Sequence, residues 1–225
     1  MAKAIQRSER RRDALSKERI VEAAIEILDE SGEDALTFRA LAARLATGSG
    51  AIYWHVADKQ ALLAAAADHV VAGVTAEAGR GEAPLVAIRA LALGVFDAID
   101  RRPWVGGQLS RDPWQYAVLR ILEGVGGRLQ ALGVPPAAQF NAATALLSFI
   151  LGLAGQYASA ARLFTPDMDR TALLGAVAAT WEQLDPAEHP FVRALAPQLP
   201  THDDREQFLA GIDLILAGIE ASARG

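Results

Sequence analysis

The segment that most constrains the fold spans residues 37–63, and it predicts two short helices, a turn and the start of a longer helix. Thr37 is a favourable N-cap, and apolar residues follow it at helical spacing. These residues are Leu41, Ala42 and Leu45. Glycine costs about 1 kcal/mol relative to alanine inside a helix. The run 47–50, Thr-Gly-Ser-Gly, therefore indicates a turn.

After the turn comes an apolar and aromatic run from Ala51 to Val56, which is too short to bury itself. Asp58 then provides the N-cap of a long helix that begins at Lys59. Two helices joined by a short glycine turn form a helix-turn-helix, whose second helix enters the major groove of DNA. The segment therefore predicts a DNA-binding element.

Residues 16–66 also resemble the DNA-binding domain of the tetracycline-repressor (TetR) family. The run 52–56, Ile-Tyr-Trp-His-Val, resembles the recognition helix of that family, and Asp58, Lys59 and the pair 62–63 resemble the start of its fourth helix. The resemblance implies a basic flexible arm at 1–15, a helix-turn-helix domain at 16–66 and a helical ligand-binding and dimerisation domain at 67–225. In this family, displacement of the fourth helix changes the spacing of two DNA-reading heads.

The phosphate-contacting residues are carried over from this resemblance. Tyr53 can donate its hydroxyl to a phosphate, and Lys59 adds an ammonium to the N-terminus of the fourth helix. His55 matches a backbone-contacting position, although its ring could equally brace the loop to Asp58. Arg39 can form a bidentate contact with guanine, and its alternative role is a surface salt bridge.

The remaining candidates surround the turn. Thr37 begins the second helix, and the leading edge of the recognition helix carries Ser49, Gly50 and Ala51. These small side chains offer little base readout, so specificity would depend on Arg39, on DNA shape and on the arm. Trp54 belongs to the same segment, but we expect its ring to fill the space between the first and third helices.

Composition excludes several classes of protein. The 225 residues contain no cysteine, which excludes disulfides and thiolate metal sites within this chain. No signal peptide and no long uninterrupted apolar span is evident, so we expect a cytoplasmic protein without a membrane partner. The net charge is −5, yet Lys and Arg balance Asp and Glu within residues 1–60. The basic arm suits phosphates or a minor groove, or is simply a solvated tail.

The rest of the chain predicts helix after helix, giving an all-α fold of about nine or ten helices. Capping residues, prolines and glycines set the expected bounds. The expected helices are 17–30, 59–78, 84–101, a short piece at 104–109, 112–132, 135–163, 167–184 and 203–223, with 189–200 mostly a loop.

A single helix reads few base pairs, so we expect a homodimer on a pseudo-palindromic operator. Apolar residues recur at helical spacing in the last helix and in the long helix before it. The predicted interface residues are Leu153, Ala160, Phe208, Ile212, Ile215 and Ile219. The alternative is that both stripes face only the core of their own chain.

The resemblance also implies a pocket for a largely apolar small-molecule effector. Large aromatic side chains and a few amides in the C-terminal part are the candidates to line it. They are Phe96, Trp104, Gln108, Trp114, Asn141, Phe149 and Gln156. Around residues 92–94 the chain lacks the polar groups that bind tetracycline itself.

No feature of the sequence predicts an enzyme, a cofactor or a metal site. Glu-x-x-His repeats, a Gly-x-Ser-x-Gly motif, a phosphate loop and a dinucleotide fingerprint do not occur. We therefore expect a ligand-responsive transcriptional regulator, most simply a repressor. The alternative is an all-helical adaptor, or a small-molecule-binding protein, without DNA activity.

Overall fold

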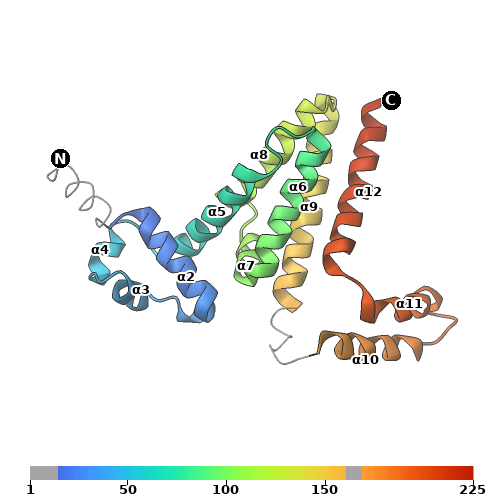
Figure 1. Cartoon of the computed structure of the whole chain (residues 1–225), viewed down its shortest axis with the longest axis horizontal. Helices are drawn as coiled ribbons and strands as arrows, with labels where there is room; N and C mark the ends of the chain where they lie inside the picture. Colours follow the sequence, from blue (N-terminus) through green and yellow to red (C-terminus); the bar gives the residue numbers. More distant parts are fainter. Residues whose placement is uncertain (1–14, 161–168, 225) are drawn as a thin grey trace.

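The computed structural model describes residues 15–160 and 169–224, which form helices and no strand. The predicted all-α class is confirmed. In Figure 1 the N-terminal helices lie at one end of an elongated molecule, and α12 stands beside α9 toward the other end. The predicted arm falls outside the described residues, except for its last residue. The N-terminal helices are α2 (Lys17–Ala35), α3 (Phe38–Arg44), α4 (Ser49–Tyr53) and α5 (Lys59–Glu77).

Side-chain caps begin three of these helices at the predicted residues. In each case an oxygen of the cap accepts a hydrogen bond from the backbone N–H three residues later. The distances are 3.3 Å for Ser16, 3.1 Å for Thr37 and 2.7 Å for Asp58. Each bond satisfies a donor that the first turn of a helix leaves unpaired. These local bonds explain why the starts could be predicted from residue types alone.

The first helix ends less abruptly than expected. Gly32 has a φ of 75° and a ψ of −177°, which is not helical geometry, and helical turns resume after it as far as Ala35. Glycine adopts this positive φ without the steric penalty that other residues incur. The expected helix at 17–30 is therefore the regular part of α2.

The C-terminal helices follow the predicted order, with two differences. One helix begins later than expected: Asp112 accepts a hydrogen bond from the backbone N–H of Trp114 at 2.9 Å, so it closes a turn, and α8 begins only at Tyr116. The expected loop at 189–200 contains helical turns. The elements are α6 (Pro84–Arg101), α7 (Pro103–Arg111), α8 (Tyr116–Ala131), α9 (Pro136–Ala160), α10 (Arg170–Glu182), α11 (Pro190–Leu195), the 3₁₀ helix η1 (Ala196–Thr201) and α12 (Asp204–Arg224).

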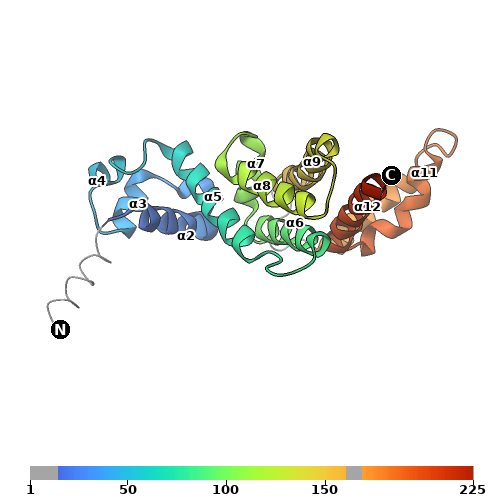
Figure 2. The ribbon, with the colours of Figure 1, turned by 90° about the horizontal axis from the view of Figure 1, so that it is seen from above.

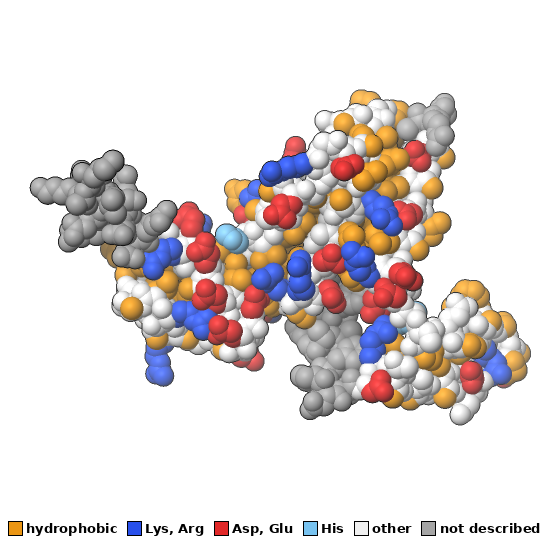
Figure 3. Space-filling model, viewed as in Figure 1, with side chains coloured by type: hydrophobic (Ala, Val, Ile, Leu, Met, Phe, Trp, Pro, Cys, Tyr) orange, Lys and Arg blue, Asp and Glu red, His pale blue; other side chains and the backbone are white. Residues whose placement is uncertain are grey.

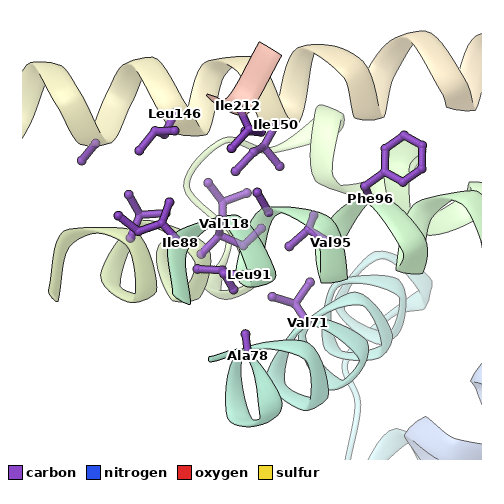
Figure 4. Packing of buried hydrophobic residues seen from close by; sticks show 14 of the residues in the cluster. Val71, Ala78, Ile88, Leu91, Val95, Phe96, Val118, Leu146, Ile150 and Ile212 are labelled. Atoms are coloured by element: carbon purple, nitrogen blue, oxygen red, sulfur yellow. The ribbon is translucent and has the colours of Figure 1, made fainter. Parts of the chain in front are cut away.

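Two clusters of buried apolar side chains meet along α5. The N-terminal cluster joins α2, α3, α4 and the first half of α5, up to Ala66. The larger cluster begins at Val71 and joins α5, α6, α7, α8, α9 and α12. Figure 4 shows its central layer, where Leu91 and Val95 of α6 lie between Val71 of α5 and Ile150 of α9. Figure 2 shows α5 running from the N-terminal helices to this bundle.

The helix α9 has an apolar sequence, yet few of its residues are buried inside this chain. The window Pro136–Leu153 has a mean hydropathy of 1.3, which is enough by length and composition to cross a membrane, yet 17% of it is buried inside this chain. It packs against α6, α7, α8 and α12. Polar residues such as Gln139 and Asn141 interrupt the window.

Candidate nucleic-acid interface and cavity

The pair α3 and α4 is anchored by its apolar face. Leu41 and Ile52 are fully buried, and Val56 is 5% exposed. All three belong to the cluster that α2 and α5 complete. Ile52 therefore lies in the core of the N-terminal helices. The opposite side of the two helices is consequently left to solvent.

The predicted contact residues lie mostly on that solvent side. Arg39, Gly50, Tyr53 and His55 are exposed, and so is Thr37, whereas Ser49 and Ala51 are half-buried. The hydroxyl of Thr37 is engaged as the cap of α3. These residues therefore share one accessible surface of the helix-turn-helix, although their contacts with DNA stay predictions.

Trp54 does not fill the space between the first and third helices, so that prediction was wrong. Its side chain is 90% exposed. Ile52 and Val56 take the buried position, and the backbone N–H of Val56 still bonds the carbonyl of Ile52 at 3.1 Å. Two residues along a helix correspond to a rotation of about 200°. Trp54 therefore lies opposite its buried neighbours, on the candidate DNA surface.

Tyr53 is held in place by a residue that the sequence analysis missed. Its ring stacks on Phe38 with centroids 4.3 Å apart and planes 3° apart. Tyr53 nevertheless remains 55% exposed. Phe38 directly follows the cap of α3, and an aromatic residue at that place is the signal that could have predicted the pair. Stacking of this kind restricts the tyrosine ring and keeps it on the surface.

At the start of α5, the groups that were predicted to bind a DNA phosphate already make bonds within the chain. The Lys59 ammonium donates to the carbonyl oxygen of Glu33 at 2.7 Å, and Asp58 already caps the helix. Lys59 therefore ties the end of α2 to the start of α5. An ammonium has three donors, so this bond leaves two for a phosphate.

A second set of contacts joins α2 to the beginning and end of α7. Asp29 accepts bonds from Arg102 at 2.8 Å and from the indole N–H of Trp104 at 2.8 Å. Glu33 forms a bidentate ion pair with Arg111, both distances being 2.9 Å. We call these bonds the α2–α7 contact. They link partners more than 70 positions apart in the chain, so no local pattern predicts them.

A cavity of about 770 Å³ opens among α6, α7, α9, α10 and α12. Apolar side chains form one part of its wall and include Phe149, Leu153 and Phe208. The polar part includes Gln156, Gln207 and Asp100. Pro103, which lies between Arg102 and Trp104 of the α2–α7 contact, also lines the cavity.

Of the predicted effector residues, Phe149 and Gln156 line this cavity, and the other five do not. Phe96 is buried behind it and stacks on Phe208 at 4.9 Å. Trp104 belongs to the α2–α7 contact and packs between the two apolar clusters. The three others lie elsewhere: Gln108 is buried beside the α7–α8 turn, Trp114 is 80% exposed, and Asn141 is exposed on α9.

The polar end of the cavity contains a group that the sequence analysis missed. Arg170 at the start of α10 donates to Asp204 at the start of α12 at 2.9 Å, and His202 contacts the same carboxylate at 2.8 Å. Arg170 also donates to the carbonyl of His202 at 3.3 Å. These bonds join α10 to α12 across a gap of 34 residues in sequence.

The predicted dimer residues mostly face their own chain. Phe208, Ile212 and Ile219 are at most 8% exposed, so the alternative interpretation, an intramolecular core, is the correct one for them. Leu153 lines the cavity, Ile215 is half-buried, and the side chain of Ala160 lies outside those described. These three buried residues are separated by four and then seven positions, so they form one stripe along α12. That stripe packs on α6 and α9.

The outward faces of α9 and α12 carry small and apolar residues instead. On α12, Ala210 and Ala217 are exposed and Leu214 is 76% exposed, and Ala210 and Leu214 also line the open side of the cavity. On α9, Ala145 and Gly152 are exposed, and Phe140 is 75% exposed. Figure 3 shows hydrophobic side chains over the part of the molecule where α8, α9 and α12 lie, with charged groups interspersed among them.

Comparisons with known proteins match both parts of the chain. A family model described as bacterial regulatory proteins, tetR family, matches residues 20–66. A second model, the tetracyclin repressor-like C-terminal domain, matches residues 95–223.

Individual relatives extend this result. A solved TetR transcriptional regulator from Streptomyces coelicolor is 51% identical, covers 93% of this chain and 100% of its own, and superimposes with a TM-score of 0.82. BioQ, solved from Mycobacterium smegmatis and also as a complex with its double-stranded DNA operator, is 26% identical over 92% of this chain and 99% of its own, with a TM-score of 0.61.

Curated relatives match a shorter region. The tetracycline repressor protein of class D from Escherichia coli is 45% identical over 58 residues, which is 26% of this chain and 27% of that repressor. The chain thus spans about a quarter of the length of that relative.

Proposed function

The chain belongs to the TetR family of bacterial regulatory proteins, and on that premise we propose that it is a ligand-responsive transcriptional repressor. It binds a pseudo-palindromic operator as a homodimer, and a small molecule releases it. The observation that carries this proposal is the exposed surface of α3 and α4, where Arg39, Tyr53 and Trp54 are accessible while Ile52 anchors the helices from behind.

The boundary between the DNA-binding part and the effector-binding part lies within α5. Residues up to 66 present the DNA-reading surface, and residues from 67 onward bind the effector and the second subunit. The two apolar clusters support this division, because one ends at Ala66 and the other begins at Val71. A protein of this kind acts on chromosomal DNA and is therefore cytoplasmic.

The homodimer forms through the outward faces of α9 and α12. Leu214 and Phe140 leave large apolar surfaces in water, and small neighbours such as Ala145 allow close approach of a second helix. The high hydropathy and low burial of α9 support the same surface. Ala217→Glu, at an exposed α12 position that does not line the cavity, should convert the dimer to a monomer in sedimentation. An unchanged sedimentation coefficient would contradict this surface.

The effector binds in the cavity beside α6, α9 and α12. The mixed lining suits a molecule with an extended apolar body and a few hydrogen-bonding groups, which Gln156 and Gln207 can meet. A metabolite library screened for release of labelled operator DNA would identify the effector.

The cavity communicates with the DNA-reading surface through the α6–α7 junction as well as through α5. Pro103 lines the cavity, and its neighbours Arg102 and Trp104 hold Asp29 of α2. Partly exposed ion pairs contribute only about 0.2–1 kcal/mol each. An allosteric coupling of about 1–3 kcal/mol is therefore enough to change such a contact.

The proposal is tested by fluorescence anisotropy with DNA that flanks the encoding gene. We expect saturable binding by the full chain, and release by an effector found in the screen. In Glu33→Gln, which weakens the α2–α7 contact, the effector should shift DNA affinity by a different factor than in the natural protein. Glu22→Gln on the same helix is the matched control. No binding to flanking DNA, or to fragments selected from a random pool, would refute the regulator.

A further inference from the structure

A groove of about 650 Å³ lies between the N-terminal helices and the larger bundle, and it shares no residue with the effector cavity. Residues of α2, of α5 and of the α7–α8 connection line it. Alanines of α5 form much of the wall, and their single methyl groups leave the space open. They are Ala61, Ala64, Ala65 and Ala72.

Two aromatic side chains line this groove and remain in water. Trp114 is 80% exposed and Tyr116 is 79% exposed. Large aromatic rings more often lie inside a protein or at a binding surface than alone in solvent. The faces of such rings attract cations within about 6 Å of the ring centroid.

The charged residues of the groove also favour a cation. Three carboxylates, Glu18, Asp68 and Asp112, line it, together with the ammonium of Lys17 and the imidazole of His69. Asp68 is paired with Arg120 at 2.9 Å, and Asp112 caps the turn through Oδ1, so its second carboxylate oxygen takes no part in that cap. The pKa of Glu18 is lowered, because its carboxylate accepts hydrogen bonds from its own backbone N–H and from Ser16, so this group is ionised at neutral pH.

Gln115, between the two rings, has an unsatisfied acceptor. Its side chain is 7% exposed and lines the groove, and its amide nitrogen donates to the carbonyls of Gln108 at 2.8 Å and Asp112 at 2.9 Å. These two bonds use both donors of the amide and fix its orientation. The buried Oε1 atom has no partner, which is unfavourable unless an N–H or O–H donor reaches it.

We propose that this groove binds a small organic ammonium ion that carries an aromatic or apolar group. The rings of Trp114 and Tyr116 contact the ligand, the carboxylates of Glu18 and Asp112 balance its charge, and an ammonium N–H donates to Gln115. The site is distinct from the effector cavity and does not require that the protein bind DNA.

The test measures ligand binding to the full chain in the absence of DNA. The four tryptophans, Trp54, Trp104, Trp114 and Trp181, give separate indole N–H signals in nitrogen-15 spectra, and Trp114→Phe identifies the one at the groove. Benzylammonium is the probe, with benzyl alcohol as its neutral analogue and benzoate as its anionic analogue. We expect benzylammonium to shift the Trp114 signal saturably while Trp54 and Trp181 stay unchanged.

The three probes should differ in the order that charge dictates. Benzyl alcohol should bind about two- to fivefold more weakly than benzylammonium, as expected for a cation–aromatic contact at an exposed site. Benzoate should leave Trp114 unshifted. Benzyltrimethylammonium, which has no N–H donor, should bind more weakly than benzylammonium. Equal binding of the cation and the alcohol would overturn the proposal, as would shifts at Trp54 in place of Trp114.

Variants separate the contributions of the groove residues. Tyr116→Leu and Asp112→Asn should each weaken benzylammonium about two- to fivefold and leave benzyl alcohol unchanged. Asparagine retains an oxygen that can cap the turn, so Asp112→Asn removes the charge alone. Glu123→Gln, an exposed carboxylate on α8 outside the groove, is the matched control and should change nothing. If Glu123→Gln weakens binding as much as Asp112→Asn, the attraction is that of the whole surface and the site is refuted.

Discussion

The N-terminal head (α2, α3, α4 and the first half of α5) and the C-terminal bundle (the second half of α5 and the helices after it) are both helical. They differ in how their candidate binding surfaces are formed. In the head, every part of the candidate DNA surface comes from residues 37–59, because two short helices and one turn carry it. In the bundle, the cavity is lined by residues from Ile99 to Leu214, drawn from five helices. The head is therefore encoded locally, and the cavity exists only after the bundle has assembled.

The DNA surface and the cavity therefore differ in how freely their residues can change. A surface built from one short segment tolerates little change, since Ile52 and Leu41 are fully buried behind it. A cavity built from distant helices can change one wall while the others keep the fold. The two parts meet at α5 and at the α2–α7 contact, so a change in the bundle can reach the head without altering its internal packing.

The largest expected difference between the head and the bundle comes from substitutions in their two apolar cores. Ile52→Ala and Ile212→Ala remove side chains of equal size that are both fully buried. Each should cost about 2–5 kcal/mol of folding free energy in its own cluster. Ile52→Ala should abolish DNA binding while dimers persist, and Ile212→Ala should destabilise the bundle. Urea unfolding followed together with sedimentation checks both. A loss of dimers in Ile52→Ala would mean that the two parts unfold as one unit.

Arg39→Ala should act on sequence recognition alone. The side chain is exposed on α3, and removal of a bidentate contact with a base costs about 1–3 kcal/mol at a single base pair. Selection of bound fragments from a random DNA pool should show relaxed preference at one position of each half-site. Arg19→Ala, on α2, is the comparison variant. Uniform weakening across all sequences would assign Arg39 to the phosphates.

Lys59→Ala should weaken binding to all sequences and lower the slope of log affinity against log salt by about one unit per head. The variant also loses the bond to Glu33, so its melting temperature must be measured beside its affinity. Lys17→Ala provides a lysine on the first turn of α2 for comparison. An unaltered salt slope in Lys59→Ala would assign this ammonium to the α2–α5 connection alone.

The smallest expected effect is the pH dependence of the melting temperature in Glu30→Gln. Hydrogen bonding from Arg44 lowers the pKa of Glu30 below its ordinary value of 4.5. A lowered folded-state pKa contributes stability above the unfolded value and loses it as the pH falls through the folded one. Glu30→Gln should therefore melt slightly below the natural protein at pH 7, and the difference should shrink as the pH falls below 4.5, the ordinary pKa of the group. A gap between the two that widens in acid would reverse this assignment.

The head was predictable because its rules are local. Ser16, Thr37 and Asp58 cap the expected helices, and Leu41 and Ala42 are buried as their spacing predicts. Trp54 was misplaced because an indole in an apolar run resembles a core residue, and only its rotation relative to Ile52 places it in solvent.

The bundle was predictable as helices but not as a site. Asp112-Pro113 has the composition of a helix start, yet the Asp112 carboxylate bonds to the next turn and delays α8 to Tyr116. Arg170 and His202 meet at the cavity through tertiary packing, and nothing near either residue in sequence indicates it. The same holds for Asp29 and Trp104.

One close fit in the bundle governs how the effector range can evolve. Gly211 of α12 lies against the ring of Phe149, and a methyl group at that glycine would collide with the ring. Both residues line the cavity. A lineage that acquires a larger residue at 211 first must accept a strained intermediate, whereas one that trims Phe149 first does not. The order of the two mutations is therefore constrained, and descendants with new effectors should carry a smaller residue at 149 before any change at 211.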